Sequence, residues 1–331
     1  MKAFSQAELK SSLKSLEADY DVQVPIALHD GTRTLGSINS GELLLAGGCL
    51  PTKPVSLFFP QVDCIMTIED ETINMQTPLE KPLLIVGFTA EDADCLEFTD
   101  KFFSSEYYDN IYFNKRDKAI IGVISGRCGN DGEIMKLSSG NCDFELVCDG
   151  EKYIAVAHSQ IGESLVQKFT GGVKIENTVY KNLKKETENL SDDNKELIEK
   201  ASKLLLDDMV PDEFWQDIAS RCIACTACNM VCPTCTCFDV FDVKRNKSIE
   251  RYRMWDSCQL DGFMREASGN NPMNEEHIRT RRRIHHKLVA DVLHWGTITC
   301  FLCGRCDSVC PSDIGILSVC REMIERYHET S

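Results

Sequence analysis

The sequence predicts an α+β N-terminal domain followed by a mostly helical C-terminal domain. Short apolar runs of strand length fill the first half of the 331-residue chain, whereas the second half carries helical patterns around a repeated cysteine motif. We therefore expect an α+β domain at residues 1–170, a linker and a helix at residues 171–210, and a dicluster [4Fe-4S] domain at residues 211–331.

The N-terminal half shows the periodicity of both helices and strands. Residues 5–20 place Leu9, Leu13 and Leu16 on one helical face. Residues 90–103, which are acidic at the start, are expected to form a second helix laid on a sheet. Short strands are expected at residues 22–28, 55–59, 64–68, 83–88 and 119–124, and a β-hairpin at residues 144–156.

The C-terminal half is expected to consist mostly of helices. Residues 171–190 are polar and charged, so we interpret them as the linker. Ser191 is a candidate cap for the helix that follows, and Pro211 opens a short helix that leads into the first cysteine motif. A longer helix is expected from Asn274 to Gly296, because glycine suits the end of a helix. The C-terminal tail is also expected to be helical.

The composition argues against several classes of protein. The net charge of −16 disfavours nucleic-acid binding, because contact with phosphates needs a positive field. The N-terminus has no apolar secretory segment, and the longest apolar runs are too short to span a membrane. We therefore expect a cytoplasmic protein, in which 18 cysteines indicate metal sites rather than disulfides. Neither G-x-G-x-x-G nor G-x-x-x-x-G-K-[ST] occurs, so we expect no flavin or NAD on this chain.

The strongest signal is a C-x2-C-x2-C-x3-C-P run that occurs twice, at residues 222–233 and 300–311. Three thiolates at this spacing bind one cube, and the fourth cysteine, next to proline, ligates the other cluster in proteins with two such runs. The spacing therefore predicts two [4Fe-4S] clusters with crossed ligation. One cluster is expected to take Cys222, Cys225, Cys228 and Cys310, and the other Cys232, Cys300, Cys303 and Cys306.

Three more cysteines, Cys235, Cys237 and Cys258, lie near the first run in the sequence. They either form a third [4Fe-4S] site, with a fourth ligand from Cys320, the N-terminal half or a partner, or they are buried thiols that pack as small apolar side chains. For the runs themselves the alternative is zinc, since C-x2-C pairs also bind zinc. A four-cysteine zinc site needs two such pairs, whereas each run here has a further C-x2-C step followed by C-P.

Cationic residues accompany the cysteine motifs. The stretch Arg279–Lys287 is the basic patch of the sequence, and it is expected either to dock an acidic partner or to shield the charge of the clusters. It has no interleaved aromatic residues, which argues against nucleic acid as its ligand. Arg221 and Arg305 lie beside predicted ligands, where a cation would raise a cluster's reduction potential, although either can also be a solvated side chain.

Several segments beyond the cysteines resemble one known family. They are Arg221–Asp242 with its Cys-Pro-Thr-Cys-Thr-Cys-Phe-Asp-Val-Phe-Asp sequence, Trp255–Cys258, Ser268–Pro272, the arginine-rich segment with His286-Lys287, and Cys303–Cys306. Over residues 212–325, and faintly over residues 82–124, the chain is similar to the dicluster iron–sulfur subunits typified by that of anaerobic sulfite reductase and by the β subunit of sulfhydrogenase-type NiFe hydrogenases. Similar subunits accompany heterodisulfide-reductase-linked flavin oxidoreductases.

The resemblance implies a helical-ferredoxin fold for the C-terminal domain and a role in anaerobic metabolism. Subunits of this family relay electrons between a partner that binds FAD and NAD(P)H and a catalytic subunit of the sulfite reductase, NiFe hydrogenase or heterodisulfide reductase type. The chain is accordingly expected to be a non-catalytic electron-transfer subunit without a substrate site. The alternatives are a redox-sensing subunit and a zinc-binding structural subunit. The sequence names neither the terminal acceptor nor the direction of electron flow.

Overall fold

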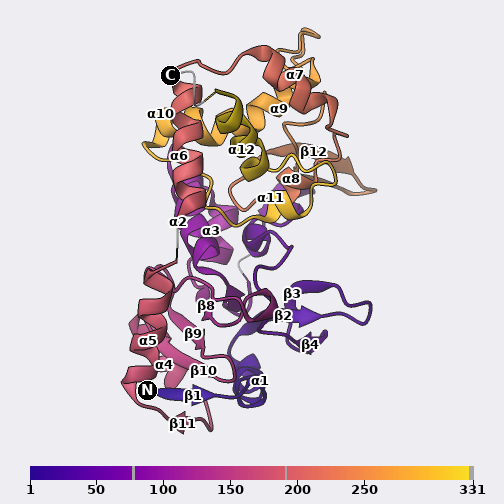
Figure 1. Ribbon diagram of the computed structural model, residues 1–331. Coiled ribbons are helices and arrows are strands. Elements are labelled where there is room, and N and C mark those ends of the chain that lie inside the picture. The colour runs from indigo at the N-terminus through magenta and orange to yellow at the C-terminus, as the bar shows by residue number, and fades with distance from the viewer. Residues whose placement is uncertain (77–78, 191, 328–331) are drawn as a thin grey trace. The chain divides into compact units, whose positions relative to one another are not determined.

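The computed structural model describes residues 1–76, 79–190 and 192–327, and the chain divides into two compact units (Figure 1). Unit 1 contains the described residues of 1–59 and 75–191, and unit 2 contains those of 60–74 and 192–331. Within the described ranges, no helix is both long and apolar enough to cross a membrane.

Unit 1 is built on a mixed β-sheet. Its strands are β1 (Lys2–Phe4), β2 (Asp21–Ala27), β3 (Arg33–Ser37), β4 (Glu42–Leu43), β7 (Leu83–Phe88), β8 (Ile120–Gly126), β9 (Phe144–Cys148), β10 (Tyr153–Ala157) and β11 (Val173–Lys174). They lie in the order β11-β1-β10-β9-β8-β7-β2-β3, with β4 paired to β2 (Figure 1). The pairs β2–β7, β7–β8 and β8–β9 are parallel, and β8 is buried along its whole length, as expected for a strand covered on both faces.

Helices cover this sheet. They are α1 (Gln6–Ser15), α2 (Ala90–Ser104), α3 (Asn110–Arg116), α4 (Gln160–Gln167) and α5 (Asn177–Glu188). Two of them begin with a capping box, Ser5 with Glu8 in α1 and Thr89 with Asp92 in α2, which satisfies amide groups at the helix start. The helices predicted near residues 5–20 and 90–103 are thereby confirmed, and so is the hairpin, as β9 and β10.

Two expectations for the first 190 residues are wrong. Residues 55–59 do not form a strand, because the apolar run is buried as a short 3₁₀ turn, η2 (Pro54–Leu57), that starts at a proline with a fixed φ. The polar segment 171–190 contains α5 instead of a linker. Its buried Leu183 packs with Val147 and Ile154 of the sheet, and this apolar anchor outweighs the polar composition of the segment.

Unit 2 combines helices with a second sheet. Its helices are α6 (Asp193–Leu206), α7 (Asp212–Ser220), α8 (Ala227–Met230), α9 (Glu276–His285), α10 (Asp291–Trp295), α11 (Arg305–Ser308) and α12 (Ile316–Tyr327), and a π-helical turn, η4 (His286–Ala290), joins α9 to α10. The sheet follows the order β12-β13-β5-β6, with strands β12 (Phe238–Lys244), β13 (Ser248–Trp255), β5 (Val62–Glu69) and β6 (Thr72–Met75). The expected strand at residues 64–68 therefore exists as β5, but it pairs with β13.

The mostly helical character predicted for the C-terminal half is therefore incomplete. The missed strands β12 and β13 form a continuous antiparallel hairpin. Alternation of Phe238 and Val240 with aspartate, followed by the short segment Arg245–Lys247, was a strand-and-turn signal in the sequence. The helix predicted after residue 191 is present as α6, whereas the Ser191 cap lies outside the described residues.

The core of unit 2 is a cluster of apolar side chains from α6, α7, α9, η4 and α12. Trp215 of α7 and Met323 of α12 are fully buried in it. The helix predicted from Asn274 starts later than expected, because Glu275 occupies the cap position of α9. Its predicted end is confirmed: Gly296 follows α10 with a left-handed φ of 76°, which glycine adopts without strain.

Candidate metal centre

The two cysteine runs fold into the same backbone shape. Ala224 and Leu302, each two residues after the first cysteine of a run, both have a left-handed φ, 51° and 61°. Thr226 and Gly304, each four residues after it, are left-handed as well, with φ of 64° and 70°. A left-handed φ is energetically unfavourable for non-glycine residues. Its repetition at matching positions therefore indicates that the loop shape itself is required. In both runs the third cysteine then lies on a short helix, α8 or α11, and these two helices contact each other.

Amide groups of these loops point at the sulfur atoms. The N–H of Ala224 donates to Cys222 Sγ, and the N–H of Ile314 donates to Cys310 Sγ, each at 3.4 Å. Backbone N–H groups of Leu302 and Ile316 lie similarly near Cys300 and Cys306. Donors of this kind stabilise negative charge on thiolate sulfur, as in iron–sulfur proteins.

The first cavity is lined by sulfur atoms from both runs. Its walls include Cys222, Cys225, Cys228 and Cys310, and we call it the Cys222 cavity. About 440 Å³ within it, including the part open to solvent, holds no protein atoms. Cys225 is exposed, so this cavity lies close to the surface of unit 2.

The second cavity has the reciprocal composition. Its walls include Cys232 of the first run with Cys300, Cys303 and Cys306 of the second, and we call it the Cys300 cavity. The space free of protein atoms is about 520 Å³, again including the open part. Cys228 borders this cavity too, so the two cavities share a wall.

Two buried cations from one helical face reach these walls. Arg283 of α9 borders both cavities and donates to the Ile314 carbonyl at 2.6 Å. Lys287 of η4, four residues later, borders the Cys300 cavity and donates to Thr234 Oγ1 at 2.5 Å. Burial by itself would lower the pKa of Lys287, but the thiols of Cys232 and neighbouring cysteines raise that pKa well above its usual range.

The thiols of the Cys300 cavity have different acidities. Burial raises the pKa of Cys300 to about 12 and also raises the pKa of Cys306. Cys232 differs, because a hydrogen bond from Cys235 and the nearby charge of Lys287 hold its pKa well below the usual range against the effect of burial. In the Cys300 cavity, a positive charge and amide groups thus stabilise the thiolate form of the cysteine side chains.

The cysteines considered for a third site separate into two environments. Cys235 borders the Cys300 cavity and interacts with Cys232. Cys258 is buried near Cys237, and the side-chain amide of Asn229 donates to its sulfur at 3.2 Å. The hydrogen bond from Cys237 contributes most to lowering the pKa of Cys258 to about 5.

The fourth ligand suggested for that site has other surroundings. Cys320 lies buried on α12 within the apolar cluster of unit 2. Burial raises the pKa of its thiol. These surroundings match those of a buried thiol that packs as a small apolar side chain.

The π-helical turn η4 anchors the second cysteine run. A π turn shifts the hydrogen-bonding pattern of a helix and frees carbonyl groups. The Lys287 carbonyl accepts from the N–H of Thr299, directly before Cys300, and the Leu288 carbonyl accepts from Ser202 Oγ of α6. Asp291 accepts from the Thr299 hydroxyl as well. The turn therefore fixes both the Lys287 side chain and the start of the second run, a feature that periodicity in the sequence did not indicate.

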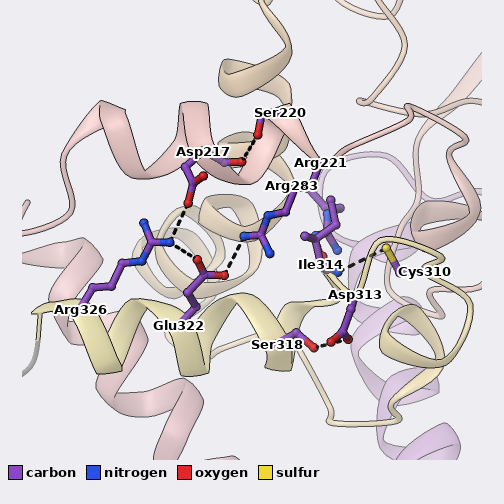
Figure 2. Close-up of polar contacts among 10 residues, drawn as sticks. All are labelled: Asp217, Ser220, Arg221, Arg283, Cys310, Asp313, Ile314, Ser318, Glu322 and Arg326. Atoms are coloured by element: carbon purple, nitrogen blue, oxygen red, sulfur yellow. Dashed lines mark hydrogen bonds and ion pairs between the residues drawn. The ribbon is translucent and has the colours of Figure 1, made fainter.

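An ion-pair network at the surface of unit 2 connects α7 with α12 (Figure 2). Arg221, directly before Cys222, pairs with Glu322 at 2.7 Å, and Arg326 joins Glu322 to Asp217. The Arg221 side chain is 39% exposed and its charge is compensated by Glu322. Exposed ion pairs contribute little free energy, so the main effect of the network is to position the start of the first cysteine run. Arg305, in contrast, is buried in α11.

The donor set fits iron–sulfur chemistry. Each cavity offers at least four soft thiol ligands, amide donors and a cationic wall, which are the features that hold a [4Fe-4S] cube. Among the residues that the structure describes, no three His, Cys, Asp or Glu side chains converge closely enough to hold a single metal ion. The thiols are instead distributed around the cavity walls.

Comparison with known proteins agrees with this geometry. Residues 221–314 match the family described as a 4Fe-4S dicluster domain. These matches make the chain similar to iron–sulfur subunits over most of its length and to a 4Fe-4S dicluster domain over residues 221–314. Over 314 residues it is 28% identical to sulfhydrogenase 2 subunit beta of Pyrococcus furiosus, and the match covers 90% of each chain. No solved structure matches the chain. The recognition made from the motifs is thereby confirmed, and the chain is an electron-transfer iron–sulfur protein.

The buried hydroxyl of Thr234 gives a test of how the cationic wall is held. Thr234 Oγ1 accepts from Lys287 and donates to the Thr299 carbonyl at 2.9 Å. Thr234→Val should lower the free energy of unfolding of unit 2 by about 1–3 kcal/mol, because two buried polar groups lose a partner. Urea unfolding of anaerobically purified protein measures this. Thr297→Val, at an exposed site two residues before Thr299, is the control, and equal urea midpoints for the two variants would contradict the assignment.

Proposed function

We propose that this chain relays electrons through two [4Fe-4S] clusters with crossed ligation. One is held by Cys222, Cys225, Cys228 and Cys310, and the other by Cys232, Cys300, Cys303 and Cys306. The observation that carries the proposal is the composition of the two cavities, because each is lined by three cysteines of one run and the last cysteine of the other. This is the arrangement that the doubled motif favours.

The residues of the site have separate tasks in this relay. Bound clusters supply one-electron chemistry, and the cysteines hold them at neighbouring positions because the cavities share Cys228 as a wall. Arg283 and Lys287 balance the negative charge of the thiolates inside a poorly solvated interior. No further cofactor is required on this chain, and flavin and NAD are expected on a partner.

The likeness to a hydrogenase β subunit supports a place within a larger complex. We propose that the chain receives or delivers electrons at a partner that binds FAD and NAD(P)H, and exchanges them with a catalytic subunit of the hydrogenase, sulfite reductase or heterodisulfide reductase type. Its C-terminal unit is proposed to be a helical ferredoxin with an added β-sheet, acting in the cytoplasm. The α+β domain at residues 1–170, the connecting segment at 171–210 and the cluster domain at 211–331 are the proposed domains.

Metal analysis tests the cofactor assignment. Anaerobically purified chain should contain about eight irons and a similar amount of acid-labile sulfide, because two cubes hold four irons each. Reduction with dithionite should produce the electron paramagnetic resonance (EPR) signals of reduced [4Fe-4S] clusters. Zinc without sulfide or visible absorption would overturn the assignment in favour of a structural zinc protein.

Crossed ligation has its own test. Cys310→Ser should remove or alter the EPR signal of the cluster in the Cys222 cavity, because the serine replaces one of its four ligands. Cys232→Ser should alter the cluster in the Cys300 cavity instead. Cys64→Ser, at a thiol on β5 that borders neither cavity, serves as the control. A Cys310→Ser protein that is altered only in the Cys300 cavity would contradict the crossing.

Co-purification tests the place in a complex. Affinity purification of the tagged chain from its native cells, without oxygen, should recover a flavin-containing subunit and a metal-dependent catalytic subunit. Added NAD(P)H should then reduce the clusters of the recovered complex, while the chain alone should not be reduced. Reduction of the isolated chain by NAD(P)H would show that the nucleotide-dependent step is on this chain and contradict the proposed division of labour.

A further inference from the structure

The structure divides the basic stretch Arg279–Lys287 into buried and exposed members. Arg279, Arg283 and Lys287 are spaced by four residues, so they share one helical face, and each is 7% exposed. Arg279 lies on neither cavity wall and donates a hydrogen bond to the Met273 carbonyl. Arg282, on the other side of α9, is exposed to solvent. The stretch is therefore not a uniform basic surface, and two of its charges face the cysteines.

We infer that Arg283 and Lys287 set the reduction potentials of the two clusters, with Arg283 acting on both and Lys287 acting on the cluster of the Cys300 cavity. This inference rests on the proposed function, since it takes the cluster sites from there. It adds which residues control how readily each site accepts an electron. Neither residue is proposed as a ligand.

The position of Arg283 carries the first part of the inference. Its side chain borders both cavities, and the thiols that interact with its charge include Cys228, shared by both walls, and Cys306 of the Cys300 cavity. The hydrogen bond to the Ile314 carbonyl holds the guanidinium in place. A guanidinium keeps its charge at any physiological pH, so it acts as a fixed positive charge between the two sites.

Lys287 distinguishes the two sites. It borders the Cys300 cavity and is absent from the walls of the Cys222 cavity. Lys287 interacts electrostatically with the cysteine side chains of Cys232, Cys235 and Cys300. Adding an electron to a cluster adds negative charge, and a buried cation nearby stabilises that state much more than a solvated one does.

Two acidic residues oppose these cations. Asp307 borders the Cys300 cavity, and its carboxylate accepts from the N–H groups of Leu317 and Ser318 at the start of α12. Those amides and the positive end of the helix spread its negative charge away from the cavity. Asp291 interacts electrostatically with Lys287, and its Oδ1 lies 3.3 Å from Nε2 of His286. Without either cation, the negative charges of Asp307 and Asp291 would be less compensated, and reduction of the nearby cluster would be harder.

The test is a redox titration followed by EPR in the complete chain. The signals are first assigned to cavities with Cys225→Ser and Cys303→Ser. Lys287→Gln should then lower the ratio of reduced to oxidised cluster in the Cys300 cavity at least tenfold at a fixed potential, which is about 59 mV for a one-electron couple. The other cluster should not shift. Arg283→Gln should shift both clusters in the same direction.

Matched variants separate charge from structure. Lys287→Arg keeps the charge and should restore the potential, whereas Arg282→Gln removes a solvated charge from the same helix and should change neither cluster. Iron content is measured for every variant. If Lys287→Gln does not retain iron, Lys287→Met is titrated in its place, and loss of iron from both would overturn the inference by making Lys287 a structural residue.

The outcomes also separate this inference from the proposed function. Full iron content with unchanged potentials in Lys287→Gln and Arg283→Gln would overturn the inference and leave the cluster assignment intact. An unmodified chain without iron and sulfide would overturn the proposed function itself. Equal shifts of both clusters in Lys287→Gln would contradict the selectivity that its position predicts.

Discussion

The organisation of unit 2 depends on the burial of cysteine sulfur and cationic side chains against one another. Thiolates in a poorly solvated interior are costly, and so are unpaired cations. Placing Arg283 and Lys287 on one face of α9 and η4, opposite the thiols of both runs, offsets each cost with the other. The helices α6, α7 and α12 supply the apolar cluster that keeps this face in place.

The π-helical turn η4 connects the buried cation Lys287 with the second cysteine run. The carbonyls of Lys287 and Leu288 in this turn accept hydrogen bonds from the amide of Thr299 and the hydroxyl of Ser202, so one turn of backbone ties the second cysteine run to α6. The same turn carries the side chain of Lys287 to the cavity wall. The irregular turn thus lies beside the candidate site, and π turns within α-helices are frequently found at functional sites.

Much of this site was predictable because covalent spacing controls cluster chemistry. The eight cysteines of the two runs could be assigned to sites from the motif alone, and all eight lie on the walls of the two cavities, while their ligation stays a prediction. The N-terminal helices followed from apolar periodicity and an acidic first turn, and the hairpin followed from strand-length runs around a turn; these are local properties. The likeness to a 4Fe-4S dicluster domain covers residues 221–314, which contain both runs.

The rest depended on contacts between distant segments, which local patterns do not encode. The pairing of β5 with β13 joins residues 62–69 to residues 248–255, and the alternation within each strand says nothing of its partner. The polar helix α5 is held by one buried leucine, a weak signal in a charged segment. The spacing of Arg279, Arg283 and Lys287 places them on one helical face, but their burial could not be read from the sequence, because it depends on distant segments that pack against that face.

Crossed ligation is the central claim, and anomalous diffraction from anaerobic crystals at the iron absorption edge tests it most directly. The predicted result is one group of iron sites bonded to Cys222, Cys225, Cys228 and Cys310, and another bonded to Cys232, Cys300, Cys303 and Cys306. A cluster whose four ligands all come from residues 222–232 would contradict the crossing. Anomalous signal at the zinc edge alone would contradict the iron–sulfur assignment altogether.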